Sequence, residues 1–248
     1  MKPRARLLLA SAFALAATGL WFWFARGSSD ESVALRTVAM KTLAEHLAKQ
    51  FPKQRVLVLA NPFIHNSRQP KSIRVMEEAS VNALKKELGG ANVVMGFPQL
   101  RPGAWENPQS FVADPESTTP LSFLVAPDAI DSLVKEHGEC KLIVSLIGLP
   151  VELNRVSAWT DTAGPRFALL LPDLRMIGST SAVVTAMRSG KLVSFVLSKP
   201  GANLDERFSG GDAQMMFDRH FLLVTLENIE SLARAHPKLF ESVGEQAR

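Results

Sequence analysis

Residues 141–147 read KLIVSLI, a short and nearly continuous apolar run. Such runs are typical of β-strands that helices cover on both faces, as in parallel sheets. Similar runs lie at 55–60 (RVLVLA), 92–97 (NVVMGF), 166–171 (RFALLL), 191–197 (KLVSFVL) and 221–225 (FLLVT). Helical stretches alternate with them, which predicts an α/β fold: a three-layer, Rossmann-like or flavodoxin-like sheet of five or six mostly parallel strands. We expect strand 141–147 to be central.

Helices are predicted from apolar residues at a spacing of three or four. They cover residues 33–51, 72–88, 128–137, 179–188 and about 227–235. The first places Leu35, Val38, Leu43, Leu47 and Phe51 on one side, and in the second Ile73, Met76, Ala83, Leu84 and Leu88 are expected to face inward. Two stretches, 98–120 and 198–212, lack periodicity and are predicted to be loops. A loop as long as 98–120 is unusual in a compact domain and is a candidate functional segment.

Residues 7–25 (LLLASAFALAATGLWFWFA) carry no charge and follow Lys2, Arg4 and Arg6. Nineteen helical residues nearly match a hydrocarbon core of about 30 Å, so the segment is predicted to be a transmembrane signal anchor. A cleavable signal peptide is the alternative, but its small-residue patterns come early in the run and an aromatic cluster, 21–24, follows. The positive-inside rule places the N-terminus in the cytoplasm and the rest in the periplasm.

The predicted organisation is therefore a single-pass inner-membrane protein whose lipid contact is its N-terminal segment. Its parts are a cytoplasmic N-terminus (1–6), the anchor (7–25), a linker (26–32) and a periplasmic α/β domain (33–248). From residue 27 onward, 24 basic residues balance 24 acidic ones, which argues against nucleic acid as a partner. The single cysteine, Cys140, cannot form an intramolecular disulfide and is expected to be a buried thiol.

Motifs of the common enzyme classes are missing from the sequence. It contains no GxGxxG, GxxxxGK[ST], GxSxG or HExxH pattern, and its histidines and cysteine are not spaced as metal ligands. We therefore expect no cofactor and no metal, and we consider catalysis the less favoured function.

Candidate ligand-binding residues are sought in the loops that follow strands, because open α/β sheets bind ligands outside the carboxyl ends of their strands. One loop follows strand 55–60 and another follows strand 166–171. Together they offer Asn61, His65, Ser67, Arg68, Asp173, Ser179 and Thr180. Polar residues of the first loop can equally stabilise a turn. Ser179 or Thr180 can equally cap the helix that follows, instead of helping its N-terminus to hold an anion.

Two stretches, 128–150 (DAIDSLVKEHGECKLIVSLIGLP) and 182–197 (AVVTAMRSGKLVSFVL), resemble the helix-strand units of periplasmic-binding-protein-like α/β domains. In that family a helix ending in an A-x-x-x-G-K pattern commonly leads into a strand. The resemblance implies a fold more than an activity. This chain departs from the family in having a predicted anchor and in being too short for two full lobes around a cleft.

Three functional hypotheses remain from the sequence. The first is a non-enzymatic, membrane-tethered domain that binds a small molecule or an envelope protein. The second is an enzyme of unrecognised type that uses Asn61, His65 and Arg68 with Asp173. The third is a structural subunit whose surface helix, 33–51, docks a partner, and it predicts an exposed apolar patch along Leu35, Leu43 and Leu47.

Overall fold

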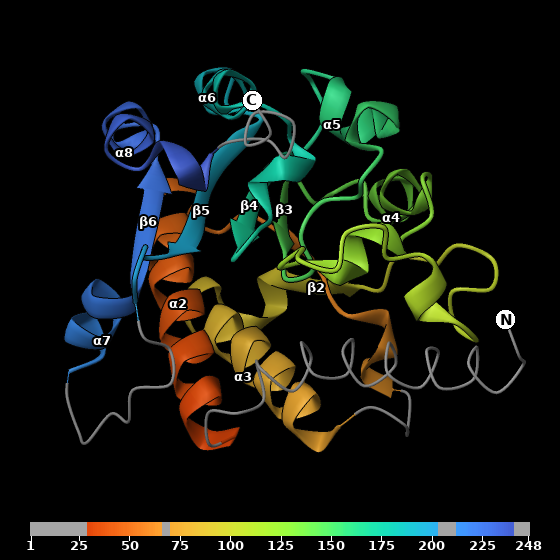
Figure 1. Ribbon diagram of the computed structural model, residues 1–248, viewed down its shortest axis with the longest axis horizontal. Helices are drawn as coiled ribbons and strands as arrows, with labels where there is room; N and C mark the ends of the chain where they lie inside the picture. Colours follow the sequence, from red (N-terminus) through yellow and green to blue (C-terminus); the bar gives the residue numbers. More distant parts are fainter. Residues whose placement is uncertain (1–28, 66–69, 203–211, 241–248) are drawn as a thin grey trace, which may run out of the picture.

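The computed structural model describes residues 29–65, 70–202 and 212–240 (Figure 1). Its helices are α2 (Ser29–Gln50), α3 (Lys71–Leu88), α4 (Ala129–Glu136), α5 (Ser157–Thr160), α6 (Thr180–Arg188), α7 (Ala213–His220) and α8 (Ile229–Ala235). Its strands are β1 (Val56–Leu59), β2 (Val93–Gly96), β3 (Leu142–Ser145), β4 (Arg166–Leu170), β5 (Leu192–Ser198) and β6 (Phe221–Thr225). The predicted anchor, 7–25, lies outside the described residues. Within the described part of the chain, no helix combines the length and apolarity needed to cross a bilayer.

One six-stranded sheet has the order β2-β1-β3-β4-β5-β6. The first five strands are parallel and β6 is antiparallel to β5, so the prediction of a mostly parallel sheet is confirmed. Strand β3 lies inside the sheet, as its apolar run predicts, and all four of its residues are buried. Strand β6 is an edge strand. There the side chain of Asn228 accepts a hydrogen bond from Thr225 N–H at 2.8 Å and donates one to the Leu223 carbonyl at 2.9 Å.

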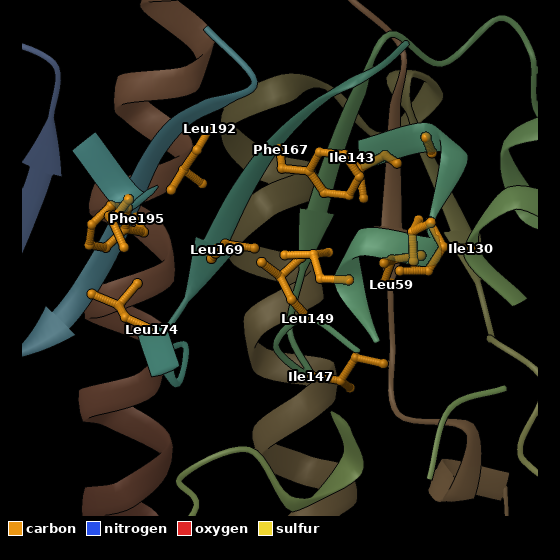
Figure 2. Close-up of a cluster of buried hydrophobic side chains, with 14 of the residues drawn as sticks. Leu59, Ile130, Ile143, Ile147, Leu149, Phe167, Leu169, Leu174, Leu192 and Phe195 are labelled. Carbon is orange, nitrogen blue, oxygen red and sulfur yellow. The ribbon is translucent and has the colours of Figure 1, made fainter. Parts of the chain in front are cut away.

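Successive strand residues pack into two separate hydrophobic cores, because their side chains alternate between the faces of the sheet. Leu59, Ile143 and Phe167 belong to the core beneath α4, α5, α6 and α8 (Figure 2). Val56 and Val144 belong to the core beneath α2, α3 and α7. The predicted three-layer arrangement is thus confirmed. Cys140 is a buried free thiol, as expected, and burial raises its pKa.

Three details differ from the sequence-based expectation. Helix α2 begins at Ser29, so it includes residues 29–32 of the expected linker. Helix α7 lies between the Gly-rich segment and β6, where no helix is expected; Asp212 caps its start by accepting a hydrogen bond from Gln214 N–H. On α3 the buried face includes Glu77 and Ser80, whereas three residues expected to face inward are only partly buried. These three are Ile73, Met76 and Ala83.

The surface-helix hypothesis is wrong about α2. Leu35 is 7% exposed, and Leu43 and Leu47 are fully buried. These side chains pack in the protein's own core against α3 and the sheet. The predicted apolar patch is therefore not available for a partner.

Candidate functional site

The carboxyl ends of the strands form the edge at which the sheet can bind a ligand. The order β2-β1-β3 means that the chain reverses direction across the sheet after β2, and ligands of such folds bind near the β1/β3 switch point. In this protein the segment that follows β2, residues 97–128, returns over that edge. It is closed on itself by an antiparallel bridge between Leu100 and Val125.

The segment packs tightly against the end of β3. Gly148, three residues beyond the strand, has a φ of 80°, and a Cβ atom added there would lie 2.8 Å from Thr119 Cβ. Ser122 Oγ is hydrogen-bonded to Thr119 Oγ1 at 3.0 Å and to the Ile147 carbonyl at 3.4 Å. The chain itself therefore fills the space beyond β3.

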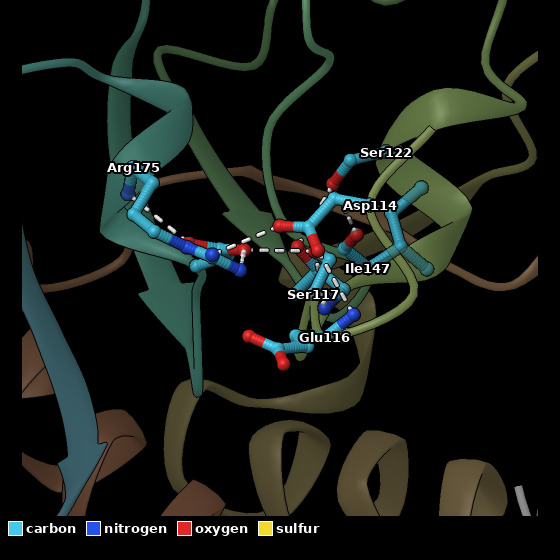
Figure 3. Close-up of polar contacts among 8 residues, drawn as sticks. Asp114, Glu116, Ser117, Ser122, Ile147 and Arg175 are labelled. Atoms are coloured by element: carbon cyan, nitrogen blue, oxygen red, sulfur yellow. Dashed lines mark hydrogen bonds and ion pairs between the residues drawn. The ribbon is translucent and has the colours of Figure 1, made fainter. Parts of the chain in front are cut away.

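A partly buried ionic cluster fixes the same segment to the end of β4 (Figure 3). Arg175 makes two hydrogen bonds to the carboxylate of Asp173, at 2.8 and 2.7 Å, and an ion pair with Asp114 at 2.8 Å. Ser117 Oγ also donates a hydrogen bond to this carboxylate, at 2.8 Å from Asp173 Oδ2. Burial alone would raise the pKa of Asp173, but the hydrogen bonds from Arg175 and Ser117 outweigh it and lower that pKa. We call Asp114, Ser117, Asp173 and Arg175 the latch.

Asp173 was predicted as a ligand-binding residue, and the structure places it within the latch. Its Oδ1 atom accepts from both the backbone N–H and Nε of Arg175, and its Oδ2 atom accepts from Ser117 and Arg175. Only 4% of its side chain is exposed. Both carboxylate oxygens therefore serve to hold the loop in place.

The other predicted site residues are spread along the edge. Asn61 is buried at the end of β1, and its Oδ1 atom accepts from Phe63 N–H at 2.9 Å, as in a turn. Ser179 caps α6 by accepting from Ala182 N–H, so the capping interpretation is confirmed. Thr180 Oγ1 donates to the Phe240 carbonyl at 3.1 Å. Ser67, Arg68 and the side chain of His65 lie outside the described residues, so their joining Asn61 in a site stays a prediction.

A buried pair that the sequence analysis missed lies beside the switch point. Arg36 of α2 donates from Nε to Ser80 Oγ at 3.1 Å and from Nη2 to the Leu146 carbonyl at 3.2 Å, just beyond β3. It lies 4.0 Å from the carboxylate of Glu77, whose Oε1 atom accepts from Asn61 N–H at 2.8 Å. Burial raises the pKa of Glu77, although Arg36 and the Asn61 amide oppose the change. The pair ties α2 and α3 to the ends of β1 and β3.

Replacing Glu77 with glutamine is expected to make stability less dependent on pH. A carboxyl group with a raised pKa binds its proton more tightly in the folded chain, so stability falls as the pH rises from the ordinary glutamate pKa to the raised one. Glu77→Gln keeps an oxygen for the Asn61 N–H and removes that loss, so the variant should be more stable than the parent above the raised pKa. Urea unfolding from about pH 5 to about pH 8 measures this, with the exposed Glu78→Gln as control. A variant that loses stability at every pH would contradict the prediction.

An open cavity of about 340 Å³ lies beyond the ends of β1 and β2. It is lined by Pro62, Phe97, Pro98, Gln99, Leu100 and Trp105. Phe97 is 38% exposed and Trp105 is 49% exposed, and the Trp105 ring is held edge-on against Phe63 with ring centroids 4.6 Å apart. None of these six lining residues is ionisable. The cavity thus offers aromatic surface and one side-chain amide at the edge where such sheets bind ligands.

A second hollow, of about 550 Å³, lies at the opposite edge of the sheet between α5 and α6. Its one buried cation, Lys191, donates to three backbone carbonyls, those of Ala158, Asp161 and Pro165. This lysine therefore pins the loop after α5. Within the described residues, no cluster of histidine, cysteine, aspartate or glutamate could hold a metal ion.

Comparison with known proteins gives a likeness of fold. No protein-family profile matches the chain, and no curated protein matches it. Among solved structures, it is similar to a carbohydrate transporter from Acidothermus cellulolyticus in complex with myo-inositol, with 14% identity, a TM-score of 0.49, and coverage of 82% of this chain and 62% of that one. A solute-binding protein of an ABC transporter from Agrobacterium vitis, bound with α-D-tagatopyranose, has 9% identity, a TM-score of 0.46 and coverage of 84% and 61%.

A glucose-galactose binding protein from Geobacillus stearothermophilus has 8% identity, a TM-score of 0.44 and coverage of 78% and 61%. This chain spans only 61–62% of the length of these three proteins. At such identities the ligand of one protein says nothing about the ligand of another. The chain thus has a weak resemblance, at the level of the fold, to periplasmic-binding-protein-like α/β domains.

Proposed function

We propose that this protein is a membrane-anchored, non-enzymatic α/β domain that binds a small molecule at the carboxyl edge of its sheet. The cavity beside Trp105 carries the proposal, because it combines exposed aromatic rings with a side-chain amide at the ligand-binding edge of the fold. Residues 7–25 would hold the domain at the inner membrane, on its periplasmic side, as their apolar length and flanking charges predict.

The lining of the cavity favours an uncharged ligand with one flat, apolar face. A charged group buried against Phe97, Trp105 and the two prolines would lose its hydration without gaining a counter-charge from them. The face of an aromatic ring instead favours a flat or ring-shaped molecule, and the Gln99 amide can donate to and accept from its polar edge. Nucleosides, cyclitols and hexoses are molecules of this kind.

The polar groups beside the switch point favour binding over catalysis. A catalytic acid or base must reach the reacting group of a substrate. Asp173 is bonded to Arg175 and Ser117, and Glu77 is bonded to the Asn61 amide and faces Arg36. Both carboxyl groups are engaged in contacts within the chain, and we assign them a structural role instead of a catalytic one.

Replacing Trp105 with alanine is expected to weaken ligand binding about tenfold, equivalent to about 1.4 kcal/mol, because the more exposed of the two aromatic rings of the cavity is removed. The full chain in detergent micelles is titrated by calorimetry with a nucleoside, a cyclitol and a hexose, each paired with its monophosphate. Trp105→Phe should restore part of the affinity. Met215→Ala, which removes a 59% exposed apolar side chain from α7, is the control.

Two results would overturn the proposal. Equal affinity of the parent and Trp105→Ala would place the ligand elsewhere, and tighter binding of a monophosphate than of its neutral partner would refute an uncharged ligand. A photo-reactive residue introduced at position 105 tests whether an envelope protein occupies the cavity instead of a small molecule. Its crosslinking in membranes to one envelope protein, without small-molecule binding, would favour the protein partner.

A further inference from the structure

Helix α2 fixes how the sheet is oriented relative to the N-terminal segment. Near its start, Arg36 contacts the Leu146 carbonyl just beyond the carboxyl end of β3. Directly after its end, the ring of Phe51 lies 5.5 Å from the guanidinium of Arg166, the first residue of β4. The helix therefore runs antiparallel to the parallel strands, and its first residue lies on the side of their carboxyl ends (Figure 1).

The connection between the predicted span and this helix is short. Residues 26–28 separate position 25 from Ser29, and the four residue steps between them can extend over at most about 14 Å. The helical residues before Arg36 add about another 10 Å. The carboxyl ends of the strands would thus lie within about 25 Å of the point where the chain leaves the bilayer. The whole of α2, about 33 Å long, separates that point from Phe51 at the opposite edge.

The carboxyl edge of the sheet, which the short connection would bring close to the bilayer, carries exposed apolar and basic side chains. Trp105 and Phe97 lie there beside the cavity, and both are substantially exposed. The first turns of α3, which follow the end of β1, expose Lys71, Arg74 and Val75. Tryptophan and phenylalanine with nearby basic residues are typical of surfaces that lie in the membrane interface.

Acidic side chains lie at the same edge. Glu31 is in the first turn of α2, and the exposed Glu106 follows Trp105. The described residues of this edge thus carry charges of both signs, and contact of the edge with lipid would depend on aromatic burial more than on attraction to anionic headgroups.

We propose that the carboxyl edge of the sheet faces the bilayer that holds residues 7–25, with Trp105 and Phe97 at the level of the lipid headgroups. This inference rests on the anchor in the proposed function and goes beyond it. The cavity beside Trp105 then opens toward the membrane surface, and its ligand enters along that surface.

Quenching of single tryptophans by lipid tests the orientation. In the full chain, Trp21 and Trp23 are replaced by phenylalanine, which keeps the span apolar. Trp159→Phe then leaves Trp105 alone, and Trp105→Phe leaves Trp159 alone. Trp159 is the matched control, because it packs against Phe167 near the amino end of β4, away from the proposed contact. Both proteins are reconstituted into phosphatidylethanolamine and phosphatidylglycerol vesicles that contain a headgroup spin-labelled lipid.

Trp105 should be quenched several times more strongly than Trp159, and reconstitution should shield it from acrylamide in the water. Equal quenching of the two tryptophans would overturn the orientation. Shielding of Trp105 from acrylamide without quenching by the labelled lipid would also overturn it, because a second copy or another protein would then cover the edge. Ligand binding is measured in detergent, so failure of the orientation leaves the binding proposal standing, and the reverse also holds.

Discussion

Replacing Arg175 with alanine should lower the free energy of unfolding by about 3 kcal/mol, because it leaves the carboxylate of Asp173 buried without its counter-charge. The side chain of Asp173 is only 4% exposed, so water cannot easily take the place of the guanidinium. Arg175→Lys is the informative control. A lysine keeps the charge, but it cannot bind both oxygens of Asp173 and also reach Asp114, so an intermediate loss is expected.

Urea denaturation measures the loss of stability caused by Arg175→Ala, provided that the m-value is the same for parent and variant. The latch also predicts a pH dependence. Since the pKa of Asp173 is lowered in the folded chain, its contribution is present above the ordinary aspartate pKa and disappears as the pH falls through the lowered value. The difference between parent and variant should therefore shrink from neutral pH to about pH 3. A loss below about 0.5 kcal/mol at neutral pH would mean that the latch does not hold the segment 97–128.

Replacing Gly148 with alanine should cost about 2 to 4 kcal/mol, through two separate effects. The φ of 80° is unfavourable for any residue with a Cβ atom, and the new atom would lie 2.8 Å from Thr119 Cβ and 2.9 Å from Ser122 Oγ. Gly190→Ala separates the two effects. Gly190 has a similar φ of 72° but nothing within 4 Å of the added atom, so it should show the backbone cost alone.

Thermal unfolding of both variants gives the comparison, and each kcal/mol should correspond to about 2 to 4 °C in Tm. The excess loss in Gly148→Ala measures how firmly the segment packs on the end of β3. Equal losses in the two variants would show that Thr119 and Ser122 move away without cost, so that the space beyond β3 could open to a ligand.

The layers of this fold could be predicted from sequence because they depend on local patterns. The run 141–147 is apolar at both faces, and the helix near 72–88 ends at glycines, one of which has a φ of 83°. Helix α7 escaped prediction because its eight residues, AQMMFDRH, follow a Gly-rich stretch and form only about two turns. Phe217 can be recognised as a core residue only when its packing with α2 and the sheet is known.

The candidate site was harder to predict, since its decisive contacts join residues that are distant in sequence. Asp173 looked available for a ligand, but Ser117, 56 residues upstream, binds it. Glu77 gave no signal in the sequence, because its partner Arg36 comes from another helix. One signal in the sequence did point to the exposed rings of Phe97 and Trp105. Both lie in or next to the long aperiodic stretch after the second strand, which is a candidate functional segment.

The amide of Asn228 at the outer margin of β6 gains importance if the domain is confined to a plane. Tethered copies diffuse in two dimensions and collide side by side far more often than free ones. An edge strand with unpaired backbone groups would let neighbouring copies pair through their strands into an extended sheet. By occupying Thr225 N–H and the Leu223 carbonyl, one asparagine side chain takes the place of a neighbouring strand there and would disfavour such pairing between tethered copies.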